Sequence, residues 1–251
     1  MQDNSALGRA MDMVRELRKR CSWDRVQTRE TLRPYLVEEV HELDQAIAQG
    51  DSRAIRDEVS DLLLHLAWQL VLAEELGEFT PGDAALYLET KMKRRHPHLF
   101  ELGPAEEWEV LKRREAEQAE VAKPGALDGL PPSLPDLLMA YRIQERAAAV
   151  GFDWPDREGP MAKVREELAE VAAESAPDRL EQEIGDLLFA VVNLARKAGV
   201  QPGPALDRAN RKFRDRFESV ERLANERAVD LHDAGLEVLD EMWEEIKKRE
   251  R

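Results

Sequence analysis

Two short stretches decide the fold of this chain: residues 166–170 read Glu-Glu-Leu-Ala-Glu, and residues 183–188 read Glu-Ile-Gly-Asp-Leu-Leu. On an α-helix, residues three apart lie on one face, so Glu167 lies beside Glu170, and Glu183 lies beside Asp186. If the two helices pack antiparallel across the short connection that contains Pro177, the four carboxylates converge inside a helical bundle. Like-charge repulsion and desolvation destabilise such a cluster, so it needs protons or hard divalent cations. We therefore expect an all-α fold with a cation site, and Mg²⁺ is the natural ion because it prefers oxygen ligands.

The rest of the chain also has the pattern of an all-α protein. Strong helix formers dominate, apolar residues recur at intervals of three and four, and no stretch alternates as a half-buried strand does. Glycine and proline divide the chain into helices of bundle length. The apolar residues 187–192 directly follow Asp186, and they predict that this part of the helix is buried and holds the carboxylates rigid.

The carboxylate pattern occurs twice, which predicts a duplicated unit. Residues 38–42 read Glu-Glu-Val-His-Glu and residues 58–63 read Glu-Val-Ser-Asp-Leu-Leu, in the same order as in the second copy. Two more pairs of similar blocks follow downstream: 91–95 with 212–216, and 108–112 with 243–247. The intervals between matching blocks vary, as differences in loop length between duplicated units would produce.

The stretch that is least compatible with a helix lies between the two copies. It contains Lys123-Pro124-Gly125 and continues through three further prolines to Pro135. We therefore expect a first helical-bundle unit at residues 1–122, a linker at 123–135 and a second unit of the same fold at 136–251.

Charge and composition exclude several classes of function. The formal net charge is −15, so the mean field of the protein repels nucleic acids and anionic membranes. The single cysteine, Cys21, allows no intrachain disulfide and no cysteine-based zinc site. The N-terminus lacks the apolar region of a secretory signal, and the longest nearly apolar run, 62–73, is shorter than the ~20 residues that span a bilayer. We expect a cytoplasmic protein with no nucleic-acid or membrane partner.

The succession of EExxE, a short gap, ExxD and an apolar helix resembles the signature of the all-α nucleoside triphosphate pyrophosphatases. The tandem arrangement is similar to that of the MazG family. Four further stretches also resemble that family: 21–24, 94–98, 150–154 and 185–189. The resemblance implies hydrolysis of nucleoside triphosphates, with broad base tolerance, between the α and β phosphates to give the monophosphate and pyrophosphate. It also implies Mg²⁺ as the cofactor, with Mn²⁺ as an alternative ion, and a homodimer.

The same resemblance assigns roles to residues of the second unit. The metal ligands would be Glu167, Glu170, Glu183 and Asp186. On a later helix, Lys212 and Arg216 would clamp phosphate oxygens. A bound metal ion would neutralise the triphosphate and activate a water for in-line attack, so no nucleophilic side chain is needed.

Other residues of the second unit have two open interpretations. Glu166 would orient the attacking water or pair with a basic residue. Lys163 and Arg179 match basic positions that contact the nucleotide, and the alternative is an ordinary helix ion pair. Trp243 would stack on the base, or would anchor the C-terminal helix in the core. The aromatic residues Phe152 and Trp154 are interpreted as core residues.

The two copies differ at positions that favour the second as catalytic. Asn193 lies in an otherwise apolar helix where the first copy has Trp68, and a buried amide needs partners that substrate can supply. Asn210 corresponds to Glu89, an anionic group near the phosphate clamp expected in the first copy. The first copy nevertheless keeps its own metal-ligand and clamp residues: Glu39, Glu42, Glu58, Asp61, Lys91 and Arg95.

The same sequence features allow several alternatives. Within the same enzyme class, the chain would be a narrower pyrophosphohydrolase, acting on dUTP or on phosphoribosyl-ATP. Outside it, the chain would be a helical dimer that serves as a scaffold for basic partners. A di-iron bundle needs two Glu-x-x-His elements, and only Glu38 to His41 supplies one. A metal site at His96 and His98 is disfavoured because Pro97 breaks the helical spacing.

Overall fold

The computed structural model describes residues 5–100 and 125–250. Within these ranges the chain forms ten α-helices and one short 3₁₀ helix, and no strand, so the all-α prediction is confirmed. The chain divides into two units, Met1–Glu106 and Glu107–Arg251, each of which is described by itself. The expected boundary at residue 122 and the repeat block at 108–112 lie outside the described residues. No helix in the described ranges combines the length and the apolar character that crossing a membrane requires.

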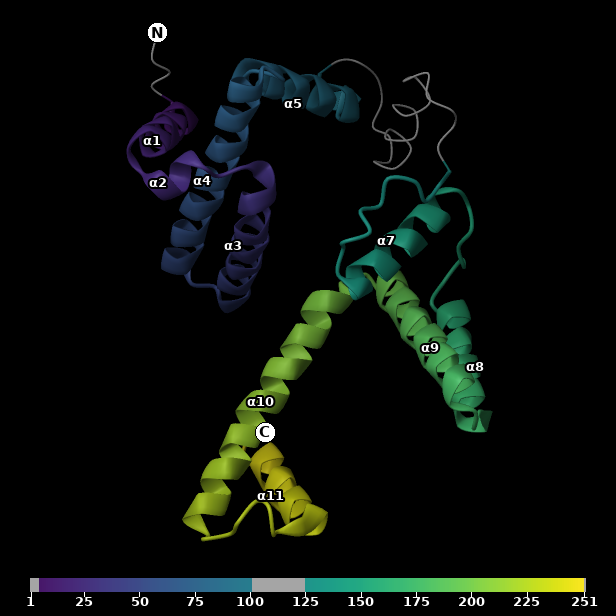
Figure 1. The fold of residues 1–251 in the computed structure, drawn as a ribbon. Helices are drawn as coiled ribbons and strands as arrows, with labels where there is room; N and C mark the ends of the chain where they lie inside the picture. Colours follow the sequence, from purple (N-terminus) through teal and green to yellow (C-terminus); the bar gives the residue numbers. More distant parts are fainter. Residues whose placement is uncertain (1–4, 101–124, 251) are drawn as a thin grey trace. The chain divides into compact units, whose positions relative to one another are not determined.

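The first unit is a small helical assembly around helix α4. Its elements are α1 (Ala6–Arg20), α2 (Ser22–Arg25), α3 (Arg29–Gln49), α4 (Ser52–Leu76), α5 (Pro81–Arg95) and the 3₁₀ helix η1 (Pro97–Leu99). Helices α1 and α3 both pack against α4 (Figure 1). The core of this unit consists of Met11, Val14, Leu32, Ala67, Trp68, Val71 and Leu72.

The α3–α4 hairpin turns within two residues. Gly50 ends α3 with a φ of 72°, in the left-handed region that glycine adopts without a Cβ penalty. Asp51 then begins α4, because its side chain accepts hydrogen bonds at 2.8 and 3.3 Å from two backbone N–H groups of the first turn. This tight turn places the two acidic stretches of the first unit on neighbouring helices.

The second unit consists of helices α7 to α11. Their bounds are α7 (Asp136–Ala149), α8 (Glu158–Ala173), α9 (Pro177–Lys197), α10 (Pro202–Glu226) and α11 (Gly235–Arg249). Helix α8 lies along α9, α7 packs on α9, and α10 pairs with α11 (Figure 1). Because only residues 174–176 separate α8 from α9, the two helices run antiparallel, as the sequence predicted. A core cluster joins α10 to α11 through Val220, Leu223, Ala224, Met242 and Ile246.

The apolar residues that follow Asp186 are not all buried. Ala190 and Val192 are buried, but Leu188 is 56% exposed, and Phe189 and Val191 are also exposed. The prediction that this whole run is enclosed was therefore wrong for the single chain. A helix that packs on neighbours along one side can bury only that side, and α9 has apolar residues on more than one side.

Candidate metal and nucleotide site

The connection between α8 and α9 fixes the register of the acidic residues. The Glu174 carboxylate accepts hydrogen bonds from the backbone N–H groups of Ser175 and Ala176, at 2.7 and 2.8 Å. Pro177 then occupies the first turn of α9, where its missing N–H is not needed. This closed turn sets which residues of α8 lie opposite which residues of α9.

Three carboxylates of the second unit converge between these helices. Glu167 and Glu170 of α8 and Glu183 of α9 each offer an oxygen, and these oxygens lie within 4.8 Å of one another. Glu167 is only 3% exposed, whereas Glu170 is exposed and Glu183 is partly buried. The fourth predicted ligand, Asp186, is exposed and lies outside this group. The structure therefore brings together three of the four predicted ligands.

Lys163 is the counter-ion of this group. Its ammonium lies 2.5 Å from a Glu167 oxygen and 2.8 Å from a Glu166 oxygen. The hydrogen bond from Lys163 lowers the pKa of Glu167. The pKa of Glu170 is raised, first by the close approach of the Glu167 carboxylate, then by burial and by the negative charges of Glu167 and Glu183. In this arrangement Glu167 holds its charge, and Glu170 binds a proton more readily than an ordinary glutamate does.

The environment of one Glu167 oxygen indicates that the group of three carboxylates fits a cation. The oxygen Oε2 is buried and has no hydrogen-bond partner among the described residues. An ionised oxygen that is buried without a partner costs free energy, and a cation placed between the three carboxylates would offset that cost. Oxygen-only ligands on rigid helices are the donor set that Mg²⁺ and Mn²⁺ accept.

The first unit has a similar but not identical group. Oxygens of Glu39, Glu58 and Asp61 lie within 4.8 Å of one another, whereas Glu42 is outside that group. Burial and the neighbouring carboxylates raise the pKa of Glu39 and that of Glu58. Because Glu39 and Glu167 correspond, the position of Lys163 is taken by Tyr35 in the first unit. The two groups therefore differ in how their negative charge is balanced.

The predicted phosphate clamp lies on the other hairpin of the second unit. Lys212 and Arg216 are on α10, and the Arg216 guanidinium pairs with Glu250 at 2.7 Å and lies 5.8 Å from the ring centre of Trp243. Trp243 is partly buried and also contacts Phe213, with ring centres 5.0 Å apart. The structure joins Arg216 to Trp243, and among the described residues their contacts are with α10 and the C-terminal residues rather than with the carboxylates of α8 and α9.

Arg179 and Asn193 lie at opposite ends of α9. Arg179 is exposed and pairs at 3.1 Å with Glu174, which precedes α9, so the ordinary helix ion pair left open above is seen for Lys163 with Glu167 but not for Arg179. Asn193 is buried, and its oxygen Oδ1 accepts two hydrogen bonds from Arg196, at 3.0 and 2.8 Å. A partner for this oxygen therefore exists within the protein.

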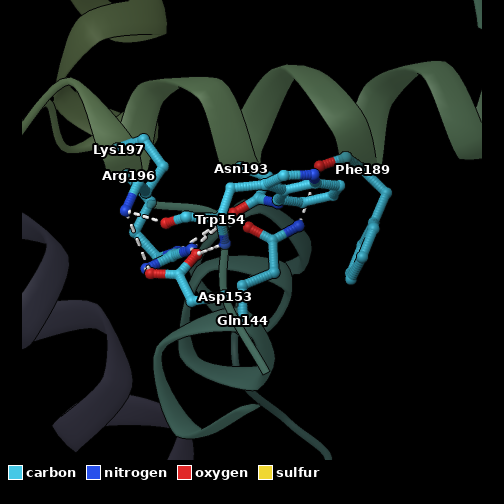
Figure 2. A network of polar contacts seen from close by, with 7 residues as sticks. All are labelled: Gln144, Asp153, Trp154, Phe189, Asn193, Arg196 and Lys197. Atoms are coloured by element: carbon cyan, nitrogen blue, oxygen red, sulfur yellow. Dashed lines mark hydrogen bonds and ion pairs between the residues drawn. The ribbon is translucent and has the colours of Figure 1, made fainter. Parts of the chain in front are cut away.

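A polar network around Asn193 was not found from the sequence (Figure 2). Arg196 pairs with Asp153 at 2.5 Å, and Lys197 pairs with the same carboxylate at 3.2 Å. The sequence feature that could have indicated this network is Asp153, which belongs to the stretch 150–154 that resembles the MazG family. The core interpretation of its neighbours was wrong, because Phe152 is 82% exposed and Trp154 is 40% exposed.

The helical hairpins and their carboxylate groups define a class: all-α proteins with acidic, metal-accepting sites on paired helices. Within that class, residues 27–100 and 161–221 match the family model described as the MazG nucleotide pyrophosphohydrolase domain. The chain is 42% identical to the nucleoside triphosphate pyrophosphohydrolase/pyrophosphatase MazG of Thermotoga maritima, over 90% of this chain and 89% of that protein. It is 40% identical to the nucleoside triphosphate pyrophosphohydrolase of Escherichia coli K12, over 96% and 95% of the two chains. The chain belongs to the MazG family of nucleotide pyrophosphohydrolases.

Proposed function

We propose that this chain hydrolyses nucleoside triphosphates to the monophosphate and pyrophosphate with Mg²⁺, at the carboxylate group of its second unit. The observation that carries the site is the buried Glu167 carboxylate, which has an unpartnered oxygen beside Glu170 and Glu183. The relatives named above support the reaction. Mn²⁺ is the expected substitute because it accepts the same oxygen ligands.

Each residue of the site has a proposed task. Glu167, Glu170 and Glu183 hold the cation, and Asp186, one turn after Glu183 on α9, completes the ligand set. When bound, the cation neutralises the triphosphate and acidifies a water. Lys163, freed from Glu167, binds a phosphate oxygen, and Glu166 accepts the proton of the attacking water. Arg179, Asn193, Lys212, Arg216 and Trp243 are the remaining proposed nucleotide contacts.

The second unit is the proposed catalytic one. The position of Asn193 is taken in the first unit by Trp68, which is 2% exposed and lies under the Arg18 guanidinium at 5.3 Å. With Tyr35 in place of Lys163, the first unit offers neither the amide nor the ammonium to a nucleotide. Its carboxylates Glu39, Glu42, Glu58 and Asp61 are a weaker candidate site.

A homodimer is proposed from the exposed apolar side chains of α9 and α10. Ile184, Leu188 and Val191 on α9 and Phe213 on α10 are each more than two-fifths exposed in the single chain. Such residues along two helices indicate a surface that a protein partner covers. A second copy can also supply the clamp residues that one chain keeps apart from its carboxylates.

Product analysis tests the proposed reaction. The chain is incubated with Mg²⁺ and a panel of NTPs and dNTPs, together with dUTP and phosphoribosyl-ATP. Release of pyrophosphate and monophosphate in equal amounts is the expected result. Activity on dUTP alone, or on phosphoribosyl-ATP alone, would show that the enzyme is specific for that compound and does not accept a broad range of bases. Diphosphate and phosphate as products, or no turnover of any compound, would refute the proposal, and the second outcome would favour the scaffold.

A further inference from the structure

Arg196 holds the side-chain amide of Asn193 in one orientation. Its Nε and Nη2 both donate to the Asn193 oxygen, at 3.0 and 2.8 Å, as Figure 2 shows. An asparagine amide has an oxygen that accepts hydrogen bonds and a nitrogen that donates them. Because Oδ1 accepts two hydrogen bonds from Arg196, the amide cannot flip and place its nitrogen there. The amide nitrogen donates no hydrogen bond to any described residue, and it is not one of the side-chain atoms that are both fully buried and without a partner. Asn193 therefore presents a fixed N–H donor.

The guanidinium of Arg196 is itself held in place by the loop before α8. Asp153 binds it at 2.5 and 3.2 Å, and this hydrogen bonding lowers the pKa of Asp153. Lys197 anchors the same loop, because its ammonium contacts the Asp153 carboxylate at 3.2 Å and donates to the Trp154 carbonyl at 2.6 Å. The Arg196 side chain is 11% exposed, so it has little room to turn away.

The network belongs to the second unit and has no equivalent in the first. Glu58 and Glu183 correspond, as do Asp61 and Asp186, so the positions of Asn193 and Arg196 fall on Trp68 and Val71. Both of these residues are 2% exposed and belong to the apolar core of the first unit. The corresponding helix of the first unit therefore packs with apolar residues at these two positions. The polar pair occurs in the unit that also has Lys163 beside its carboxylates.

The place of Asn193 on α9 suits the nucleoside end of a substrate. It follows Glu183 by ten residues on the same helix, which corresponds to about 15 Å at a rise of 1.5 Å per residue. A triphosphate bound at the carboxylates can extend its sugar and base over a distance of this order. A fixed N–H donor there is tolerant of base identity, because purines and pyrimidines both have acceptors, such as adenine N3 and thymine O2.

We propose that Arg196 and Asp153 are positioning residues, which fix the Asn193 amide as an N–H donor to the nucleoside part of the substrate. The inference rests on the proposed function and adds how this end of the substrate is recognised. Neither residue belongs to the carboxylate group at which the phosphates are proposed to bind. Their effect is therefore on substrate binding rather than on the chemical step.

The test compares Arg196→Lys with Lys197→Met in the full chain. Arg196→Lys keeps the positive charge beside Asp153 but lacks the pair of N–H groups, Nε and Nη2, that bind the Asn193 oxygen. Lys197→Met removes the hydrogen bonds from Lys197 to the loop and leaves Arg196 intact. We expect KM for ATP and for UTP to rise about tenfold in Arg196→Lys, with kcat within about twofold, because one oriented hydrogen bond is lost. Lys197→Met is expected to raise KM by clearly less than Arg196→Lys does, at most about threefold, because Arg196 keeps its own hydrogen bonds to Asp153 and Asn193.

Inorganic triphosphate separates the phosphate end from the nucleoside end. Its inhibition constant against ATP should be unchanged in Arg196→Lys, because it has no nucleoside. A parallel rise in that constant would overturn the inference. So would equal rises of KM in Arg196→Lys and Lys197→Met, because the network would then only anchor the loop.

A double variant shows whether Arg196 acts through Asn193. Adding Arg196→Lys to Asn193→Ala should raise KM by less than about twofold, whereas two independent, multiplying effects would contradict the inference. Thermal unfolding checks that each variant is folded. If Arg196→Lys does not fold, Asp153→Asn replaces it, and this variant is also expected to raise KM while leaving kcat nearly unchanged. Calorimetric binding of α,β-methylene-ATP repeats the comparison without turnover. A wild type that binds this analogue but releases no pyrophosphate would refute the proposed function alone.

Discussion

Lys163 and Glu167 form a balanced pair that a bound cation would have to rearrange. The ammonium satisfies one oxygen of the buried carboxylate at 2.5 Å, and the other oxygen stays without a partner. A divalent cation that binds Glu167 repels the ammonium, so the two positive charges compete for the same carboxylate. In the metal-free protein, the charge of Glu167 is therefore balanced by a residue that we also propose as a phosphate contact.

Replacing Lys163 by methionine should make the metal-free protein less stable and more dependent on the cation. Methionine keeps the length of the side chain but leaves Glu167 buried with no counter-ion, which is costly. We expect a lower Tm in a chelating buffer and a larger rise in Tm on adding Mg²⁺ than the wild type shows. Thermal unfolding with and without Mg²⁺ measures both. An unchanged Tm in the chelating buffer would show that Lys163 does not balance this group.

Glu170 should make the stability of the metal-free protein fall as the pH rises. Its pKa is raised in the folded state, so between the ordinary glutamate value, about 4.3, and the raised value the folded chain binds more protons than the unfolded chain. Stability therefore decreases as the pH rises through this window and is regained as the pH falls. Glu170→Gln lacks the ionisable group and should lose that part of the slope.

The comparison of Tm against pH for wild type and Glu170→Gln, both in a chelating buffer, checks this sign. The two curves should diverge above the ordinary glutamate pKa, with the variant the more stable. Parallel curves, or a wild type that gains more stability than the variant as the pH rises, would contradict the assigned shift.

At the scale of elements, the loop before α8 depends on a glycine. A Cβ built at Gly159 would lie 2.0 Å from Cδ1 of Trp154, a separation that side chains do not tolerate. Gly159→Ala must therefore displace the Trp154 ring, which belongs to the loop that carries Asp153. We expect a loss of about 1–3 kcal/mol in the free energy of unfolding, the usual cost of overpacking.

Gly203→Ala is the matched control for this substitution. Gly203 also lies in the first turn of a helix of the second unit, α10, but a Cβ there meets nothing within 4 Å. Alanine has the higher helix propensity, so this variant should be neutral or slightly more stable. Urea unfolding of both variants gives the difference, and equal stabilities would show that the Trp154 contact is unimportant.

The elements themselves were largely predictable from the sequence, because their signals are local. Helical spacing, and breaks such as Gly50 and Pro177, identified the α3–α4 and α8–α9 hairpins, and the repeated acidic stretches placed three carboxylates in each. The Asp153–Arg196 network was not predictable in this way. Its two residues are 43 positions apart, and only the fold brings them together.

The exposure of the apolar residues of α9 could not be predicted either, because it depends on which helices the fold places beside them. Residues 187–192 are apolar, which indicates burial but does not say against what. In the single chain, α7 and α8 cover part of the helix and leave Leu188 exposed. The apolar pattern of residues 187–192 therefore predicts the helix correctly, but it does not predict which of its sides neighbouring helices cover.

At the scale of the whole molecule, the exposed apolar residues predict self-association. The wild type should have twice the mass of the 28.7 kDa chain in light scattering after size-exclusion chromatography. Leu188→Glu should weaken the dimer because it places a charge in the apolar surface of α9. Leu236→Glu, at an 83% exposed position on α11, is the control and should leave the mass unchanged. A monomeric wild type at micromolar concentrations would contradict the dimer.

We propose that the carboxylates of the second unit, rather than those of the first, catalyse hydrolysis of nucleoside triphosphates. The most direct measurement is pyrophosphate release from ATP with Mg²⁺ by the wild type, Glu167→Gln and Glu39→Gln, since these two residues occupy the same position in the two copies. Removing a ligand of the catalytic cation should lower kcat about 100-fold or more in Glu167→Gln. Glu39→Gln should stay within a few-fold of the wild type. The reverse pattern, or full activity in both variants, would contradict the account.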